Sequence, residues 1–231
     1  MAESVDEEHR ARELLVAQER AGELFAAVEA AGIIGAGVSE TEATDAITEL
    51  AADLFGVERH WHKRIVRSGP NTLLTYPADP PDRVIEADDI AFVDFGPVFD
   101  GWEADYGRTW VIGGDPDKLR LRNDLADVFE RGRAHFEAHP DITGEELYRH
   151  IMEISGERGW VYGNHHCGHL VGEYPHEDFP GARPASHLMA GSSEPIRRLD
   201  PSGRVAHWIL EVHLVDPAGG YGGFYEELLT L

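Results

Sequence analysis

Two acidic residues stand inside the most β-prone stretch of this chain, VDFGPVFDGWEADYGRTW, residues 93–110. Apolar and aromatic side chains on both sides of a turn signal at Asp100-Gly101 predict a β-hairpin. Asp94 falls inside the first strand and Asp105 inside the second. An ionised carboxylate in an apolar interior is costly unless something compensates its charge. Whatever this chain folds into must therefore supply that compensation.

A two-residue turn fixes the register of this hairpin and places the two acids. Side chains alternate between the faces of a strand, so Asp94 and Gly96 share a face, and Gly96 lies opposite Asp105. The two carboxylates are then diagonal neighbours, with β-carbons roughly 5–8 Å apart. Gly96 leaves room between them for another group.

A second pair of acids occupies a second predicted hairpin. Glu211 lies in WILEVHLV and Glu226 in GGFYEELLTL, and a connection of about six residues makes them face each other across the strands. Four carboxylates from two hairpins then converge. Bare, they repel and take up protons, whereas divalent cations turn them into ligands. The alternative is that the acids cap loops or pair with arginines, the candidates being Arg64, Arg67 and Arg108.

The stretch NHHCGHLVGEYPHE, residues 164–177, adds four histidines. One neutral imidazole is a suitable extra ligand in a carboxylate site, and such a set fits Mn, Fe, Co or Zn better than a cysteine-rich structural zinc site. Two cations bridged by carboxylates at about 3.5–4 Å can generate a hydroxide and stabilise an oxyanion. Cys167 is interpreted as a small buried apolar residue and not as a nucleophile.

The order of the predicted elements occurs twice along the chain. Each half has a helix, a second helix opened by a capping box, a strand, a loop and a hairpin; the capping boxes are Ser39–Glu42 and Thr143–Glu146. The predicted elements of the first half are helices at 5–31 and 40–56, a strand at 62–67 and hairpin strands at 90–98 and 103–112. Those of the second half are helices at 117–138 and 144–158, a strand at 160–162 and hairpin strands at 206–215 and 223–230. The irregular stretch 180–203 is typical of a lid or of an ordinary surface loop.

Composition restricts the class of protein. The 231 residues are 42% apolar, as in a globular protein, and carry a formal net charge of −23. That charge argues against a nucleic-acid partner, which needs a positive surface. No apolar run is long enough for a membrane span, and the acidic start lacks a signal-peptide pattern. A single cysteine fits a reducing cytoplasm.

The chain resembles the pita-bread metallopeptidases, a family that includes methionine aminopeptidases, Xaa-Pro aminopeptidases and Xaa-Pro dipeptidases. The resemblance rests on VDFG, ADYGRT, GHLVGEYPHE and GGFYEELLTL in this order, and covers roughly residues 10–231. It implies an α+β pita-bread fold of two ααβ-hairpin halves, 5–113 and 114–231, around a curved antiparallel sheet. It also implies one catalytic domain over residues 1–231, without the separate N-terminal domain of most Xaa-Pro enzymes.

The resemblance assigns roles to the acids and to two histidines. It implies two divalent ions held by Asp94, by Asp105 and Glu226 as bridging ligands, and by His169 and Glu211. Glu211 would also handle the proton of the attacking water. Two further choices follow from the pattern: Glu226 is preferred to Glu227 because it completes G-x-x-x-E from Gly222 on the inward face, and His176 would donate to the substrate carbonyl or oxyanion.

The chain departs from the family pattern where substrates are recognised. Thr75 stands before Tyr76 where a His-Tyr pair is usual, and either His60 or His62 could substitute for that histidine. The family's usual Glu-Pro-Gly is Glu211-Val-His here, so His213 stands in the place of the glycine. His62, Thr75, Tyr76, His213 and Arg198 are the expected substrate contacts.

The resemblance implies a hydrolase in which a metal-bridged hydroxide attacks a peptide or imide carbonyl of a short peptide, most naturally of Xaa-Pro type. The altered positions leave open a hydrolase or lyase of the same fold that acts on a small non-peptide substrate. A non-catalytic binding module is a third alternative, disfavoured because the whole ligand set is present. A cytoplasmic manganese enzyme and a homodimer are further expectations.

Overall fold

The computed structural model describes residues 2–176, 185–200 and 202–231. Its helices are α1 (Ala2–Ala31), α2 (Glu40–Phe55), the 3-10 helix η1 (Gly69–Leu73), α3 (Pro116–Ala138) and α4 (Gly144–Glu157). Its strands are β1 (Ile65–Ser68), β2 (Ile90–Phe95), β3 (Val98–Phe99), β4 (Trp102–Glu103), β5 (Tyr106–Val111), β6 (Val161–Tyr162), β7 (His166–Val171), β8 (His187–Met189), β9 (His207–Val215) and β10 (Gly222–Leu228). None of the helices among the described residues is both long and apolar enough to cross a bilayer.

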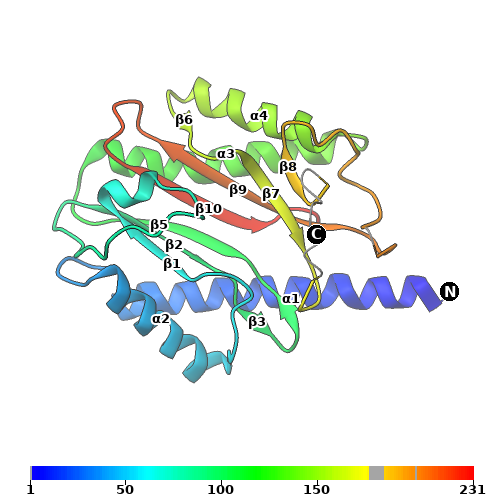
Figure 1. The fold of residues 1–231 in the computed structure, drawn as a ribbon, viewed down its shortest axis with the longest axis horizontal. Coiled ribbons are helices and arrows are strands. Elements are labelled where there is room, and N and C mark those ends of the chain that lie inside the picture. The colour runs from blue at the N-terminus through cyan, green and yellow to red at the C-terminus, as the bar shows by residue number, and fades with distance from the viewer. Residues whose placement is uncertain (1, 177–184, 201) are drawn as a thin grey trace.

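Both halves of the chain contribute to one antiparallel sheet, with the strand order β1-β2-β5-β10-β9-β7-β8 and β6 also paired to β9. The first half supplies β1, β2 and β5, and the second half supplies the rest, so the halves meet where β5 lies beside β10. Figure 1 shows the elements of the two halves on opposite sides of this seam. The predicted α+β fold with a repeated order of helices and hairpins is confirmed.

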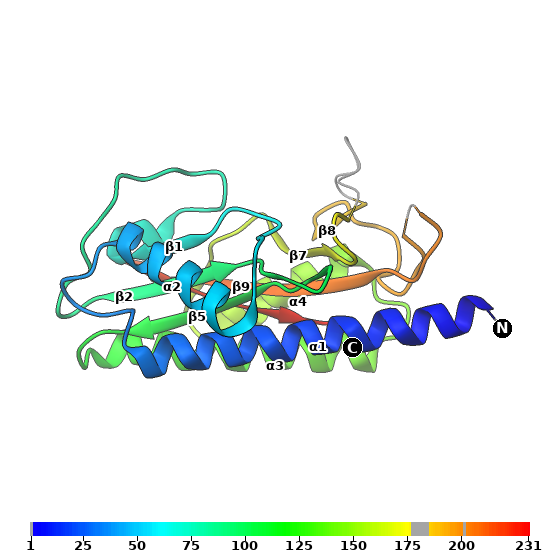
Figure 2. The ribbon, with the colours of Figure 1, turned by 90° about the horizontal axis from the view of Figure 1, so that it is seen from below.

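The helices form a layer along the sheet. Figure 2 shows α1 and α3 on the same side of the sheet, beneath the strands, where both contact β5 and β10. Strand alternation sorts the residues of β2 between two faces. Val93 and Phe95 pack into the core with α1 and α2, whereas Phe92 joins Ile65 and Phe224 in a separate small cluster. Asp94 lies two positions after Phe92 in β2, so it is on the same face of the strand as Phe92 and points away from the helices.

The helix ends follow the predicted chemistry. Ser39 accepts from the backbone N–H of Glu42, whose carboxylate accepts in return from the Ser39 N–H. Thr143 and Glu146 repeat this reciprocal arrangement at the start of α4. Each box satisfies two backbone donors that a helix start would otherwise leave unpaired.

The first hairpin has the predicted register but is interrupted. Phe99 pairs with Trp102 around the Asp100-Gly101 turn, whose two residues have φ of 52° and 92°, as a primed hairpin turn requires. Asp94 pairs with Gly107 in the continuation of the same register. Between these two ladders the strands separate, and the break contains both Gly96 and Asp105.

The room beside Gly96 is occupied by protein. A β-carbon built on Gly96 would lie 2.2 Å from Cδ2 of His62 and 2.4 Å from Nε1 of Trp61. The sequence predicted a strand from residue 62, but β1 begins at Ile65. His62 therefore lies in the segment before the strand, which turns its ring onto Gly96.

Strand β7 is not predicted by the sequence pattern, which indicates a loop between residue 162 and the second hairpin. Gly168 sits in the middle of β7 with φ of 154°, and a β-carbon there would lie 2.0 Å from the carbonyl oxygen of Ile209. Only glycine permits β7 to approach β9 so closely, and this glycine among polar histidines obscured the strand pattern. Of the stretch 180–203, residues 180–184 and 201 lie outside the described residues; the rest includes β8.

Candidate functional site

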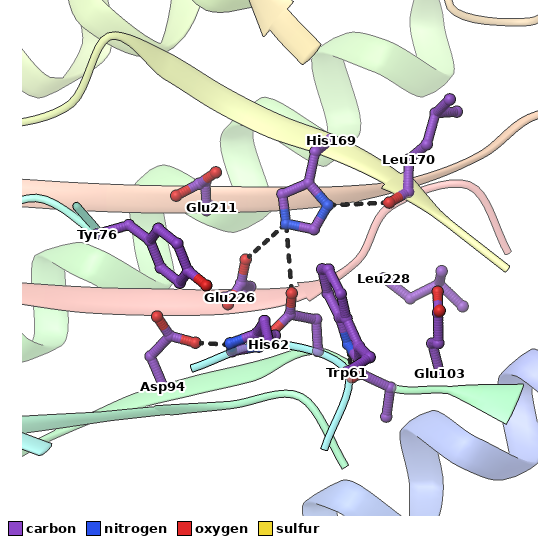
Figure 3. A network of polar contacts seen from close by, with 12 residues as sticks. Trp61, His62, Tyr76, Asp94, Glu103, His169, Leu170, Glu211, Glu226 and Leu228 are labelled. Atoms are coloured by element: carbon purple, nitrogen blue, oxygen red, sulfur yellow. Dashed lines mark hydrogen bonds and ion pairs between the residues drawn. The ribbon is translucent and has the colours of Figure 1, made fainter. Parts of the chain in front are cut away.

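The four predicted acids converge in one cavity of about 490 Å³. Asp94 lies on β2 and Asp105 just before β5, while Glu211 on β9 is paired directly with Glu226 on β10. All four are buried, with exposed fractions between 2% and 8%. Figure 3 shows Glu211 and Glu226 approaching from one side and Asp94 from the other. The convergence was predicted from strand alternation, and the two halves of the fold produce it together.

His169 on β7 completes the predicted set. Its Nε2 lies 3.2 Å from Oδ2 of Asp105 and 3.6 Å from Oε1 of Glu226. Its Nδ1 lies 2.9 Å from the carbonyl oxygen of Leu170 (Figure 3). Because a carbonyl can only accept, Nδ1 carries the proton and Nε2 is the nitrogen that faces the acids.

His62 makes a matching approach from the first half of the chain. Its Nε2 lies 3.0 Å from Oδ1 of Asp105 and 3.6 Å from Oδ1 of Asp94. Its Nδ1 lies 2.7 Å from the carbonyl oxygen of Lys63. The two oxygens of Asp105 therefore each face a different histidine.

Glu211 has its own polar neighbours. The side-chain amide of Asn164 donates to Oε2 at 3.1 Å. Nδ1 of His166 lies 2.7 Å from Oε1, yet the two groups are not oriented as a hydrogen bond, and both atoms are buried without a hydrogen-bond partner. Two orphaned polar atoms side by side fit a position where a further group binds to both.

Arginine forms no direct ion pair with these acids among the described residues, although the charges of Arg67 and Arg108 act on Asp94 and Glu226 from a distance. Among the described residues, the ion pairs of the four carboxylates are all with histidines. Arg108 pairs with Glu227 instead, which alternation places on the opposite face of β10 from Glu226. Arg67 donates to the carbonyl oxygens of Leu74 and Ala78. The alternative that these acids pair directly with arginine is therefore wrong for this site.

The charges around Asp105 depend on the two nearest histidines. Burial is the largest influence on Asp94 and, with the charge of Asp105 nearby, raises its pKa to about 7 although His62 opposes the shift. For His62, burial favours the neutral ring, but Asp105 and Asp94 outweigh it and raise the pKa to about 9. Burial also opposes the ionisation of Asp105, yet His62 and His169 hold its pKa below the usual value. The centre attracts positive charge, whether as protons or as a cation.

In the second half of the chain, burial and the neighbouring charged groups again determine the pKa values of the site residues. Burial, supported by the charge of Asp105, raises the pKa of Glu226 well above its usual value. Burial opposes the charged form of His169, but hydrogen bonds to Asp105 and Glu226 raise its pKa well above the usual value. Burial likewise opposes the ionisation of Glu211, while His166 outweighs it and lowers the pKa.

His176 is held by a carboxylate that the sequence analysis missed. Oε2 of Glu103 lies 2.6 Å from Nδ1 of His176, and Oε1 accepts from the His176 backbone N–H at 3.1 Å. Glu103 is 2% exposed and also accepts from the backbone of Gly172. The pair fixes the ring with Nδ1 toward Glu103. The sequence did hold a signal for Glu103: it lies two positions before Asp105, so strand alternation places both acids on the same face of the hairpin.

The expected substrate contacts divide into two groups. His62, Thr75, Tyr76 and His213 line the cavity. Arg198 is not among the described residues that line it, so the expectation is corrected: its guanidinium lies over the ring of Trp208, 4.9 Å from the centroid, where the negative charge density of the ring face attracts it. Asn164 and His166 were not among the expected site residues, because the pairing of β6 and β7 with β9, which brings this stretch to Glu211, has no local signal in the sequence.

These donors fit divalent cations. Two groups each place one ligand atom from every member within 4.8 Å of the others: His62, Asp94 and Asp105, and Asp105, His169 and Glu226. Carboxylate oxygens with single imidazoles match the preferences of Mn, Fe, Co and Zn. Asp105 belongs to both groups, so it is the residue through which two ions would be bridged.

A comparison with protein families identifies the class. Residues 12–202 match the family model described as metallopeptidase family M24. The chain therefore belongs to metallopeptidase family M24.

The individual relatives are identical to this chain at fewer than a third of the aligned residues. An Xaa-Pro dipeptidase of Pyrococcus horikoshii is 31% identical over 146 residues, which are 62% of this chain and 40% of that protein. An Xaa-Pro dipeptidase of Lactobacillus helveticus is 28% identical over 145 residues, 62% of this chain and 39% of the other. The chain thus matches about two fifths of the length of these relatives.

Solved structures share the fold over nearly the whole chain. The X-Pro aminopeptidase of Thermotoga maritima has a TM-score of 0.72 at 21% identity, covering 97% of this chain and 61% of that one. The Xaa-Pro dipeptidase of Bacillus anthracis has a TM-score of 0.72 at 22% identity, covering 96% and 60%. The pita-bread fold implied by the sequence resemblance is confirmed.

Proposed function

We propose that this chain is the catalytic domain of a metal-dependent peptidase that hydrolyses a short peptide of Xaa-Pro type. The observation that carries the proposal is the meeting of Asp94, Asp105, His169, Glu211 and Glu226 in one cavity. Membership of a metallopeptidase family supports it, as do relatives named Xaa-Pro dipeptidase.

The five residues would hold two divalent ions, with Asp105 and Glu226 shared between them. When bound, such ions lower the pKa of a coordinated water and polarise the carbonyl that is attacked. The chain's own carboxylates neutralise the positive charge and fix the positions of the ions. Glu211, beside the orphaned Nδ1 of His166, is the proposed carrier of the proton from the attacking water to the leaving amine.

His176 is the proposed donor to the oxygen of the scissile carbonyl. Its Nδ1 faces Glu103, so its Nε2 is the nitrogen left for the cavity, which both residues line. A donor aimed at developing negative charge is worth about 100- to 1,000-fold in rate. Glu103 is a positioning residue in this scheme, because it acts through His176.

Glu103→Gln is expected to lower kcat by roughly 100-fold, because an amide can present its NH₂ to Nδ1 and invert the ring tautomer. Bound metal should be unchanged, which atomic absorption measures. His176→Ala should have a similar effect, and the double variant should be no slower than the slower single one. Additive losses would show that the two residues act separately.

A small non-peptide substrate is the second candidate. Thr75 stands in the cavity where the family usually has a histidine that positions the amide, and Ile65, Phe92 and Phe224 make an apolar wall beside the acids. A wall of this kind suits a compact apolar group as well as a proline ring. This candidate retains the ions and changes only the bond that is broken.

A substrate screen distinguishes the two. Xaa-Pro dipeptides, Xaa-Pro tripeptides, methionyl peptides and small amidines would be tested with added Mn²⁺ or Co²⁺. Hydrolysis of Xaa-Pro dipeptides that is lost on chelation would support the first proposal. Turnover of amidines alone, with no activity toward peptides, would support the second, and full activity after metal removal would contradict both.

Further features belong to the same proposal. Manganese is the proposed ion, and the halves 5–113 and 114–231 are proposed to work as one catalytic domain. Cys167, buried and not in a disulfide, is compatible with a reducing cytoplasm. A homodimer is proposed as the assembly, and sedimentation velocity would test it.

A further inference from the structure

We infer that His62 is a sixth protein ligand of the metal centre, so that each of the two ions has its own histidine. The inference rests on the proposed function, because it presupposes the ions. It assigns His62 to the metal and not to the substrate contacts where the sequence analysis placed it. His169 would serve the ion between Asp105 and Glu226, and His62 the ion between Asp105 and Asp94.

The tautomer of His62 is fixed by the backbone. Nδ1 lies 2.7 Å from the carbonyl oxygen of Lys63, which can only accept, so the proton is on Nδ1. In a neutral ring Nε2 then carries a lone pair directed at Asp105 and Asp94. A lone pair facing two carboxylates is repelled unless a cation lies between them. Histidines that bind metals characteristically donate their other ring N–H to a carbonyl in this way.

His169 has the same arrangement in the other half of the chain. In both residues Nδ1 faces the carbonyl of the next residue, Lys63 or Leu170. In both, Nε2 approaches one oxygen of Asp105 closely, at 3.0 Å for Oδ1 and 3.2 Å for Oδ2. A bridging carboxylate gives one oxygen to each ion, and here each oxygen already faces its own imidazole.

The spacing of the His62 group suits one ion. Nε2 is 3.0 Å from Oδ1 of Asp105 and 3.6 Å from Oδ1 of Asp94. Nitrogen and oxygen ligands about 2.1 Å from a metal lie roughly 3.0–3.4 Å apart when they are neighbours in octahedral or tetrahedral geometry. The corresponding distances for His169 are 3.2 Å and 3.6 Å. The two groups are therefore equally well formed.

The ring of His62 is also held in place. Its side chain is 8% exposed. Its ring makes edge-to-face contacts with Trp61 and Tyr76, with ring centroids 4.5 Å and 6.0 Å apart. Gly96 supplies the space beneath it, since any β-carbon there would overlap the ring. A ligand fixed before the ion arrives loses little freedom on binding.

The competing explanation is that His62 is a protonated ring that takes the place of one ion. It predicts a single bound metal, held by His169 and the acids around it. Counting the ions and the coordinated imidazole nitrogens separates the two explanations without any assay of activity.

The experiment compares the wild-type chain with His62→Gly and with the matched control His60→Gly. His60 lies two positions earlier and packs against Phe95, and it belongs to neither group of candidate ligands. Metal-free proteins would be titrated with Co²⁺ by calorimetry and visible absorption. Pulsed EPR of the Mn²⁺ forms would count coupled histidine nitrogens. Circular dichroism would establish that each variant is folded.

Wild type and His60→Gly should bind two ions and show two coupled imidazoles. His62→Gly should keep one ion at wild-type affinity, bind the second about 100-fold more weakly or worse, and lose one imidazole signal. Added imidazole should restore the second ion in His62→Gly, because it fills the space of the deleted ring. If His62 served in packing alone, added imidazole would restore no signal of a metal-bound imidazole in His62→Gly.

Two results would overturn the assignment while leaving the proposed function intact. One is wild-type metal binding by folded His62→Gly. The other is a wild-type chain that binds one ion with a single coupled imidazole, as the protonated ring predicts. A wild-type chain that binds no Co²⁺ or Mn²⁺ would instead remove the proposed function itself.

Discussion

Glu226→Gln is expected to lower turnover at least about 1,000-fold and to reduce the bound metal, whereas Glu227→Gln should leave both close to wild type. The two residues are adjacent on β10 and differ in the face they occupy. Glu226 is 2% exposed and lies among the acids. Glu227 pairs with Arg108 and accepts from the hydroxyl of Tyr225.

The size of the effect follows from the charge that is removed. Glutamine keeps the volume of Glu226 but is a weak, neutral ligand, so the proposed pair of ions would lose one of its two shared carboxylates. A loss of about 4 kcal/mol in transition-state stabilisation corresponds to roughly 1,000-fold in rate. Glu227→Gln instead weakens an ion pair outside the cavity, which affects stability and not the reacting groups.

The comparison is decisive because the variants differ by one position in a single strand. Metal content by mass spectrometry and kcat/KM for an Xaa-Pro dipeptide would be measured on both. Equal losses in the two variants would mean that β10 is sensitive to any change. Full activity in Glu226→Gln would contradict the role of the carboxylate.

Chelation of the metal is expected to lower the free energy of unfolding by about 4 kcal/mol when the free ion had been present at about 1,000 times its dissociation constant. Four buried acids then face one another, and among the described residues their ion-pair partners are all histidines. In a chain of this size, such a loss corresponds to a fall of roughly 8–16 °C in Tm.

Thermal unfolding followed by circular dichroism, with and without chelator, measures the shift. Glu226→Gln supplies the internal control, because a chain that no longer holds the ions should respond little to chelation. An unchanged Tm in the wild-type chain would show that the ions contribute nothing to the folded state. An equal shift in both proteins would point to an effect of the chelator itself.

The sequence predicted those features that depend on local rules. Strand alternation and a two-residue turn were sufficient to bring Asp94 beside Asp105, because the register of a hairpin is set by its turn. The capping boxes located the starts of α2 and α4. Glu226 could be distinguished from Glu227 because adjacent residues of a strand face opposite ways.

Other features depend on contacts between distant segments, and the sequence did not reveal them. The approach of His62 to Asp105 requires the segment before β1 to fold over Gly96. The strand β7 requires Gly168 to lie against Ile209. No local pattern encodes either contact.

The site can form only after β5 of the first half and β10 of the second half have paired at the seam between them. β10 and β5 share one registered pair, Glu226 with Gly107, and next to it the hydroxyl of Thr109 bonds both backbone groups of Phe224. Strand pairs within a half join segments that are near in the chain, so they close short loops at low entropic cost. Contacts across the seam join residues more than one hundred positions apart. Each hairpin should therefore form early and the proposed metal pocket last, so that uptake of an ion would mark the completion of folding and could not guide it.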